Sequence, residues 1–336
     1  MPLVLTVNIG SSSVKLATFD AGSLARTGNA TATRVTNREE ALDRALSELG
    51  AGDVVAVGHR VVHGGPRFDA PARLGPDVIA ALRELAWLDP EHLPAELDAI
   101  ESLERRLPNV PHVACFDTAF HRDLPRVARL LPIPLRYERE GVRRYGFHGL
   151  SYTFLVGALG DEARGRVVLA HLGSGASLAA VVNGKPIETT MAFSPASGIP
   201  MGTRSGDLDP GVMLHFVRQE GLSADAIARL VNHESGLRGL SETSGDVRDL
   251  LAAEATDPRA KDALAVFVYR VKLAIGSLAA AMGGIDLLVF SGGIGENAPL
   301  IRERITAGLE HLRFRTRVIP TDEEIVIARQ TLEALR

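Results

Sequence analysis

Residues 3–19, LVLTVNIGSSSVKLATF, decide the fold of this chain. Residues 3–7 and 14–19 are predicted as two strands, because each is a short apolar run and a turn of Gly and Ser separates them. Such a turn leaves backbone N–H groups uncovered and adds small hydroxyl donors, which suits a phosphate, and Lys15 adds a point charge. The turn is not the P-loop, which runs into a helix. An ordinary Ser-rich hairpin turn is the alternative interpretation.

The composition is typical of an ordinary soluble globular protein with room for two domains. The 336 residues are 46% hydrophobic and 23% charged, and a formal net charge of −4 gives no reason to expect nucleic acid or an anionic membrane surface as a partner. The apolar stretches are strand-sized, well short of the ~18 residues of a membrane span, and no signal peptide is visible. The one cysteine, Cys115, excludes an internal disulfide and indicates a reducing compartment, the cytoplasm. Any metal is expected to be a hard ion held by oxygen ligands and phosphates.

The opening pattern recurs about half a chain later. Residues 167–172 are predicted as a strand, residues 173–175 as a Gly-Ser-Gly turn and residues 176–182 as the returning strand. Asn-Gly at residues 183–184 is a strong tight-turn signal that leads to a third strand. The recurrence predicts a duplicated α/β domain.

Strands and helices alternate through the rest of the chain, which favours helices on both faces of each sheet. The predicted helices span residues 39–49, 76–87, 94–106, 211–220, 224–232 and 262–282, a helix begins at Pro299, and another closes the chain. The further predicted strands span residues 54–57, 110–116, 286–290 and 317–320. The predicted domains are residues 1–120 with 322–336, and residues 121–321.

Polar groups directly follow several of the predicted strands. In open α/β sheets, ligands bind beyond the carboxyl ends of the strands. The groups in such positions are Asn8, His59, Arg60, Asp117, His171, Gly173 and residues 292–297. If the strands share one sheet edge or two facing edges, these groups converge on one crevice, which favours a functional site more than any single motif does.

Two of the motifs contain an arginine for which a functional role is weighed. Arg60, in the motif GHRVVHGG, has the fork that binds a carboxylate or phosphate at two points, although a surface arginine in a tight loop is the simpler interpretation of this motif alone. Arg204 lies in MGTRSGDLDP, a loop dense in Gly and charge of a kind seldom needed for packing, so a functional Arg204 is favoured. In the same loop, the structural interpretation is that Asp209 caps the following helix and Asp207 orders the loop.

Other motifs have both a functional and a structural interpretation. Asp117, at a strand end, would orient or deprotonate a substrate, or cap the next segment. His148, in RRYGFHG, is undecided, and Arg143 or Arg144 would add a cation near the chemistry. The turn GGIGEN fits a nucleotide base or phosphate edge, although such turns are common. In TDEE, Thr321 is predicted to cap the last helix.

With all these segments in order, the chain resembles the acetate kinase, or short-chain carboxylate kinase, family, a member of the acetate and sugar kinase, Hsp70 and actin superfamily. The resemblance runs from the first strand to the last helix, and so many motifs in one order are specific. It implies two ribonuclease-H-like α/β domains, duplicated and each with a mixed sheet and flanking helices, around a central cleft. The matching segments are NxGSSSxK at 8–15, GHRVVHGG at 58–65, FDTAFH at 116–121, RRYGFHG at 143–149, HLGxGAS at 171–177, MGTRSGDLDP at 201–210, GGIGEN at 292–297 and IPTDEExxIAR at 319–329.

The resemblance also implies an activity and a set of site residues. The family reversibly transfers the ATP γ-phosphoryl group to a carboxylate, with acetate or propionate the expected acid, and gives an acyl phosphate and ADP. It uses Mg²⁺ (or Mn²⁺), forms homodimers, here with dimer contacts expected in the C-terminal domain, and closes its two domains on substrate. By match, Asp117, His148 and Arg204 are catalytic, Asn8 and Glu323 hold the metal, and Arg60, Val62, Phe147 and Pro195 bind the acid. By match, the ATP-binding residues are Ser11, Ser13, Lys15, His171, Leu172, Gly173, Ser174, Gly175, Asp246, Val247, Arg248, Gly293, Ile294, Gly295, Glu296 and Asn297.

The chain departs from the family pattern mainly on the acid-binding side. Residues 89–94 read DPEHLP where the family usually reads APLHNP, and residues 195–200 read PASGIP where it reads PLEGLM. Glu91 would stand at the apolar wall of the acyl pocket, where it would repel a carboxylate or require a partner cation. The chain is also shorter than typical members, with deletions expected between residues 20 and 50 and between 312 and 317.

Two alternatives to an acetate or propionate kinase follow from these departures. The altered segments would admit a longer, branched or polar acid. A nucleotide-binding protein without catalysis is disfavoured, because ATP binding alone does not require Arg60, Asp117, His148 and Arg204. Since a carboxylate substrate is already ionised at pH 7, Asp117 is expected to orient groups or metal rather than to act as a base.

Overall fold

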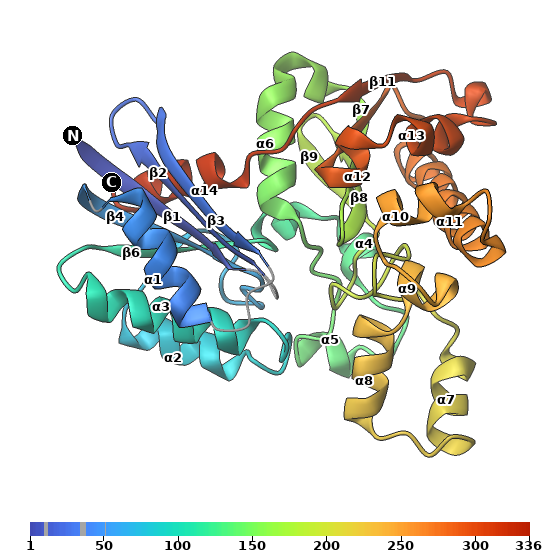
Figure 1. The fold of residues 1–336 in the computed structure, drawn as a ribbon, viewed down its shortest axis with the longest axis horizontal. Coiled ribbons are helices and arrows are strands. Elements are labelled where there is room, and N and C mark those ends of the chain that lie inside the picture. The colour runs from blue at the N-terminus through green and yellow to red at the C-terminus, as the bar shows by residue number, and fades with distance from the viewer. Residues whose placement is uncertain (10–12, 34–37, 51) are drawn as a thin grey trace. The chain divides into compact units, whose positions relative to one another are not determined.

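The opening hairpin is the centre of a six-stranded sheet in the computed structural model, which describes residues 1–9, 13–33, 38–50 and 52–336 (Figure 1). The strand order is β3-β2-β1-β4-β6-β5. Strands β1, β2 and β3 are antiparallel neighbours, whereas β4 and β6 run parallel to β1. The strands are β1 (Pro2–Ile9), β2 (Ser13–Asp20), β3 (Arg26–Thr33), β4 (Asp53–Val61), β5 (Ala72–Arg73) and β6 (His112–Phe116).

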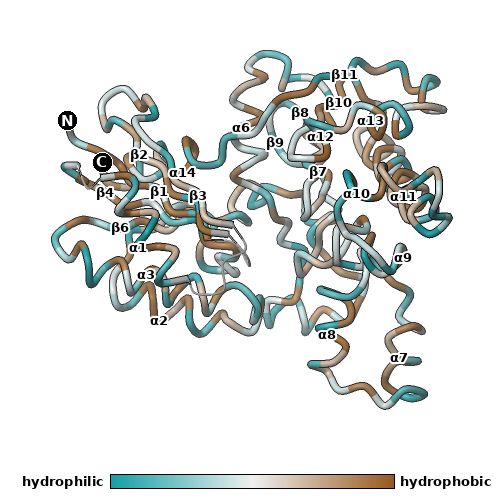
Figure 2. The backbone as a smooth tube through the Cα atoms, in the orientation of Figure 1, coloured by the Kyte–Doolittle hydropathy of each residue, from teal (hydrophilic) through white to brown (hydrophobic). Residues whose placement is uncertain are grey.

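The central strand β1 is buried on both faces, which explains why it is a nearly continuous apolar run. Successive side chains of a strand point to opposite faces. Leu5 of β1 therefore packs with Leu42 of α1 (Arg38–Leu49), whereas its neighbour Val4 packs with Ala328 of α14 (Glu323–Ala334). Figure 2 shows the resulting hydrophobic colouring along β1. The other helices of this part are α2 (Pro76–Glu84), α3 (Leu93–Arg106) and the first half of α6 (Gly149–Leu159).

A second sheet of five strands repeats the same topology. Its order is β11-β10-β7-β8-β9, with β7, β8 and β9 antiparallel and with β10 and β11 parallel to β7. This order matches β6-β4-β1-β2-β3 of the first sheet strand for strand. The duplicated, mixed α/β architecture expected from the sequence is therefore confirmed. The strands are β7 (Arg166–Leu172), β8 (Ala176–Val182), β9 (Lys185–Thr189), β10 (Leu287–Ser291) and β11 (Arg315–Val318).

The longest helix of the described chain, α11 (Pro258–Met282), packs on the second sheet. By length and composition it is the one described helix that would be able to cross a membrane. A stripe along it that includes Leu264, Phe267, Val271 and Ile275 is fully buried, so it serves as a core helix. The other helices around this sheet are α4 (Arg126–Arg129), α5 (Arg136–Arg139), α7 (Pro210–Arg218), α8 (Ala224–His233), α9 (Gly236–Ser241), α10 (Val247–Ala253), α12 (Gly292–Asn297) and α13 (Pro299–Thr306). Across both sheets, the described 3₁₀ turns span Ala119–Asp123, Gly160–Arg164 and Glu310–Leu312.

The chain divides into two compact units. Unit 1 comprises Met1–Arg122, Phe147–Phe154 and Asp322–Arg336, and unit 2 comprises Asp123–Gly146 and Leu155–Thr321. The sequence-based division assigned all of residues 121–321 to one domain. The structure instead returns Phe147–Phe154 to unit 1, where Leu150 joins the core formed by β6 and α14.

Several predicted elements differ in detail from the structure. Strand β4 runs on to Val61, so His59 and Arg60 lie within its last residues rather than after it. Strand β3 and helix α6 were not predicted. The cap of the last helix is Asp322, whose Oδ1 accepts the N–H of Ile325 at 3.1 Å, so the prediction that Thr321 caps this helix is wrong. The carboxylate one residue further along therefore accepts an unpaired N–H of the first helical turn.

Candidate active site

Arg60, near the end of β4, lies between two buried carboxylates. Its Nε and Nη2 donate to Oδ2 of Asp117 at 2.9 and 2.6 Å, and its Nη1 donates to Oε1 of Glu96 at 3.0 Å. The other oxygen of Glu96, Oε2, accepts the backbone N–H of Val62 at 2.8 Å. Asp117 follows β6, the parallel neighbour of β4, and Glu96 lies in the first turn of α3. The ends of two adjacent parallel strands thus bring Arg60 and Asp117 together.

The cluster around Arg60 holds more negative than positive charge. Burial raises the pKa of Glu96 to about 7, although the charge of Arg60 opposes the shift. Burial and the nearby charge of Asp117 likewise raise the pKa of Glu323 to about 7, against the opposing charges of Arg60 and Lys15. Burial alone would lower the pKa of Arg60, but Asp117 and Glu96 raise it. Near neutral pH both glutamates therefore bind a proton readily unless another cation joins them.

Asn8 and Glu323 form the second part of this site. The amide Nδ2 of Asn8, in β1, donates to Oε2 of Glu323, the first residue of α14, at 3.1 Å. The buried Oδ1 of Asp117 has no hydrogen-bond partner among the described residues. No group of three or more metal-ligating His, Cys, Asp or Glu side chains occurs in the described ranges. An amide oxygen and carboxylate oxygens nevertheless fit Mg²⁺ or Mn²⁺, which takes few protein ligands and would supply the positive charge that these carboxylates lack.

Lys15 lies beside Asn8, because the two residues are direct partners across the antiparallel pair β1 and β2. Its side chain is exposed, which leaves its charge accessible. Ser13 is described by its backbone alone, as the first residue of β2. Ser11, predicted to bind ATP, lies outside the described residues.

His148 has a backbone conformation that non-glycine residues seldom adopt, with φ of 58°. The next residue, Gly149, donates its N–H to the carbonyl of Asp117 at 2.9 Å. A Cβ at Gly149 would lie 2.1 Å from that carbonyl oxygen, so only glycine permits this approach. Strained backbone of this kind is concentrated at functional sites. The predicted acid-pocket residues Val62 and Phe147 are also in unit 1, and both are buried.

The segment that departs from the family pattern, residues 89–94, contains a further buried acid, Asp89. Oδ1 of Asp89 accepts the backbone N–H of His92 at 3.0 Å and lies 2.9 Å from Nδ1 of the same residue. Glu91, expected at the pocket wall, is half-buried, and it is Glu96, in the first turn of α3, that joins Asp117 as a carboxylate partner of Arg60. Asp89 lies in the segment that the sequence marked as a departure, although only Glu91 was singled out there, whereas Glu96 belongs to no quoted segment.

Unit 2 contains a cavity of ≈ 670 Å³ among its glycine-rich turns. It brings together segments that are far apart in the sequence: the turn between β7 and β8, the loop before α7, the start of α10 and the residues around α12. The predicted ATP-binding residues that line it are Gly173, Ser174, Asp246, Val247, Arg248, Gly293, Ile294 and Asn297. The lining residues that the sequence reasoning missed are Gly202, Thr203, Gly245, Leu251, Ala298, Pro299 and Leu300, all within a few residues of a predicted one.

The remaining ATP-binding residues predicted in unit 2 do not line this cavity as described. They are His171, Leu172, Gly175, Gly295 and Glu296. The structure gives one of them a clear supporting role, since Oε1 of Glu296 accepts the N–H groups of Gly292 at 2.9 Å and of Thr321 at 3.3 Å and so holds the glycine turn in place.

Asp246 has a structural as well as a candidate binding role. It caps α10, because its Oδ1 accepts the N–H of Arg248 at 2.9 Å, and its Oδ2 accepts from Nη2 of the same residue at 2.6 Å. These hydrogen bonds to Arg248 lower the pKa of Asp246. The side chain of Arg248 is 86% exposed, so a ligand in the cavity has access to its guanidinium.

The loop that carries Arg204 is ordered by its own acids. Asp207 Oδ1 accepts the N–H of Gly198 at 2.8 Å, and Asp209 caps α7, so the structural interpretation of both acids is confirmed. Nη1 of the half-buried Arg204 donates to the carbonyl of Pro195 at 3.3 Å, which brings these two predicted residues together in unit 2.

Arg144 is a structural residue rather than a cation near the chemistry. Its Nε donates to the carbonyl of Ala128 at 3.0 Å and its Nη1 to that of Thr189 at 2.7 Å. It also forms an ion pair with Glu188 at 3.3 Å. These contacts tie the segment after α5 to β9.

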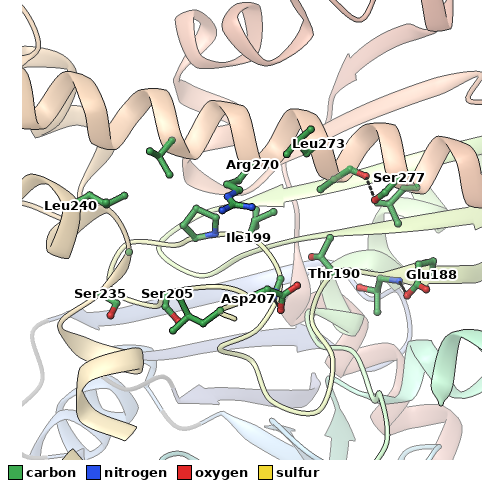
Figure 3. A pocket seen from close by; sticks show the side chains of 18 of the residues that line it. Glu188, Thr190, Ile199, Ser205, Asp207, Ser235, Leu240, Arg270, Leu273 and Ser277 are labelled. Carbon is green, nitrogen blue, oxygen red and sulfur yellow. Dashed lines mark hydrogen bonds between the residues drawn. The ribbon is translucent and has the colours of Figure 1, made fainter. Parts of the chain in front are cut away.

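A larger cavity of ≈ 820 Å³ in unit 2 contains none of the predicted site residues. It lies between α11 and the loop of residues 190–208 (Figure 3). Arg270 and Leu273 of α11 stand over Ile199 and Asp207 of the loop in this view. This cavity therefore does not coincide with the candidate chemistry.

Comparisons with known proteins agree with this arrangement. A model of the Acetokinase family matches residues 24–318. An acetate kinase of Nitrobacter hamburgensis is 42% identical over an alignment that covers 100% of this chain and 96% of the relative, and one of Rhodopseudomonas palustris is 46% identical over 82% and 75%. The first alignment has 392 positions against 336 residues, so the relative contains segments that this chain lacks.

Solved structures of acetate and propionate kinases share the fold of this chain. The crystal structure of Porphyromonas gingivalis acetate kinase superposes with a TM-score of 0.89 at 32% identity and full coverage of both chains. That of a propionate kinase from Francisella tularensis superposes with a TM-score of 0.92 at 31% identity, over 99% of this chain and 100% of that one. This chain belongs to the acetokinase family.

Proposed function

We propose that this chain transfers the γ-phosphoryl group of ATP to the carboxylate of a short-chain acid such as acetate or propionate, reversibly, to give an acyl phosphate and ADP. The observation that carries the proposal is the fork of Arg60 between Asp117 and Glu96, beside the Asn8–Glu323 pair. The family and the acetate and propionate kinase structures support the same reaction.

The reaction needs positioning and charge neutralisation rather than covalent catalysis. Arg60 binds the substrate carboxylate, and one carboxylate oxygen attacks the γ-phosphorus as the bond to the β,γ-bridging oxygen breaks. No proton is removed, since the acid is already ionised. Asp117 orients Arg60 through its two hydrogen bonds, and His148 and Arg204 stabilise the charge that spreads over the transferred group. Val62, Phe147 and Pro195 line the side of the acyl group.

A divalent cation, Mg²⁺ or Mn²⁺, completes the site. Asn8 and Glu323 are its proposed protein ligands, and the nearby negative charge of Asp117 adds to the need for a cation there. Such an ion neutralises the phosphate oxygens of ATP. The cavity among the glycine turns of unit 2 is the proposed nucleotide site, and Lys15 is a proposed phosphate ligand.

The active enzyme is proposed to be a cytoplasmic homodimer with its contacts in unit 2. Large apolar side chains exposed on this unit support the dimer, among them Leu214 and Val217 of α7, Leu240 of α9, and Tyr269 and Leu273 of α11. Exposed apolar surface of this kind marks interaction sites.

A second candidate is a kinase for a polar acid. The observation in its favour is the pair of buried carboxylates, Asp89 and Glu96, on the acid-binding side. An acid that carries a hydroxyl group would donate a hydrogen bond to either of them.

Trapping of the acyl phosphate with hydroxylamine tests the proposal, with purified protein, Mg-ATP and a panel of carboxylates from formate to branched and hydroxy acids. Turnover is expected with acetate or propionate. Asp117→Ala and Arg204→Ala are expected to abolish turnover and leave ATP binding nearly intact. Asp225→Ala and Arg229→Ala, matched changes at exposed positions, are the controls. Normal turnover of both site variants would refute the proposed mechanism.

A further inference from the structure

Glu96 occupies part of the group that would bind the substrate. A guanidinium has five N–H donors. Those of Arg60 that contact Asp117 and Glu96 are the Nε–H, one on Nη2 and one on Nη1, which leaves one N–H on each terminal nitrogen for another acceptor. A substrate carboxylate that binds Arg60 therefore comes within hydrogen-bonding distance of Glu96.

The charges that face Glu96 make this approach unfavourable for an anion. Arg60 of β4 contributes the one strong positive charge, and it is shared with Asp117. From the turn before α3, Asp89 adds negative charge that raises the pKa of Glu96, and His92 opposes it. The side chain of Glu96 is 3% exposed, so water screens these charges little.

Protonation of Glu96 removes the repulsion between its carboxylate and that of the substrate. If Oε1 of Glu96 is protonated, it becomes a donor, and the substrate carboxylate can accept both this O–H and the N–H that Arg60 now directs to it. Oε2 keeps the N–H of Val62. The proton comes from solvent and returns there when the substrate leaves, so no other group changes its charge.

We propose that Glu96 is a positioning residue that shares Arg60 with the substrate and takes up one proton when the substrate carboxylate binds. This inference rests on the proposed function, because it requires a carboxylate substrate at Arg60. It extends that function, since neither the motifs nor the resemblance assigned a role to Glu96. Affinity for the acid thereby becomes dependent on pH in a range where the acid itself does not titrate.

The test is the pH dependence of the KM for acetate, measured from pH 6 to 9 at saturating Mg-ATP. Because Glu96 has a pKa of about 7 without substrate, the wild-type KM for acetate is expected to be constant well below pH 7 and to rise tenfold per pH unit well above pH 7. At pH 8.5 the KM should be about thirtyfold higher than its low-pH value. Glu96→Gln, which cannot ionise, is expected to give a flat profile. Glu104→Gln, the same change on the same helix, is the matched control and should retain the wild-type rise.

Each outcome is decisive. If the wild-type KM for acetate does not change with pH while turnover is normal, the proposed role of Glu96 is wrong. This result requires no variant, so the test stands even if Glu96→Gln does not fold. A rise that persists in Glu96→Gln also overturns it and assigns the titration to another group. Absence of acyl phosphate with every acid of the panel overturns the proposed function itself.

Discussion

Replacement of Arg60 by alanine removes the cation that two buried carboxylates share, and its effect on stability should depend on pH. The guanidinium holds Asp117 through Nε and Nη2 and Glu96 through Nη1. Both carboxylate side chains are at most 3% exposed, so neither can turn to water when the arginine is lost. Removal of one partner of a buried ion pair costs about 3–5 kcal/mol.

The sign of the pH effect follows from Glu96. Its pKa is raised from 4.5 to about 7 in the folded protein, so its contribution to the free energy of unfolding is complete below pH 4.5 and is lost as the pH rises through 7. At pH 8 Glu96 is charged, and Arg60→Ala should cost about 4 kcal/mol. At pH 5.5 Glu96 is neutral and one ionic contact remains, so the loss should fall to about 2 kcal/mol.

Urea unfolding followed by the fluorescence of Trp87 measures this difference. Trp87 is the one tryptophan of the chain and lies in unit 1, between α2 and α3, so its emission reports on the unit that contains Arg60. Arg67→Ala is the control, because its ion pair with Glu84 is exposed and should contribute less than about 1 kcal/mol. Equal losses at pH 5.5 and 8, or a loss below about 1 kcal/mol at pH 8, would refute the reasoning.

Three further predictions follow from the same structure. Glu323→Gln should raise the Mg²⁺ concentration for half-maximal activity about tenfold or more, which a Mg²⁺ titration of turnover measures, and an unchanged requirement would remove Glu323 from the metal site. Gly293→Ala should raise the KM for ATP without changing the unfolding midpoint, because a Cβ there meets no atom within 4 Å but enters the cavity. Gly292→Ala should instead lower the midpoint, since its φ is +76° and its Cβ would lie 2.7 Å from a backbone oxygen of β7; similar midpoints for the two variants would contradict this. The buried pair His59 and His112, with ring nitrogens 2.8 Å apart, has both pKa values lowered by burial, so its contribution is complete above about pH 6.5 and is lost as the pH falls below it. Between pH 7.5 and 5, urea midpoints of wild type should therefore fall relative to those of His112→Gln, and parallel curves would count against the idea.

The hairpins and the order of most elements could be predicted because they depend on local signals. An apolar run of strand length and a glycine turn specify β1, β2, β7 and β8 wherever they occur. Strand β3 has no such run: it reads RTGNATAT, and its stability comes from pairing with β2 along one edge. Helix α6 was missed because its residues are apolar on all sides, without the periodicity that identifies a surface helix.

The same distinction separates the site residues that were found from those that were missed. Asp117 follows an apolar strand and Arg60 lies among the last residues of one, near the sheet edge where the rules of α/β sheets place ligands. Glu96 stands among the charged residues of α3, where it resembles an ordinary solvated acid. Its importance arises from a contact with a residue 36 positions away, and no local pattern encodes such a contact.

The return of α14 to unit 1 has a consequence for how the protein is made. Helix α14 packs so closely on β4 that a Cβ at Gly58 would lie 2.1 Å from Oγ1 of Thr331. All of unit 2 is nevertheless translated before α14. A nascent chain on the ribosome can therefore fold unit 2 first, before α14 covers one apolar face of the first sheet. Glu323 is the first residue of α14, so a chain still being synthesised would complete the proposed nucleotide pocket before it gains Glu323, a proposed ligand of the metal.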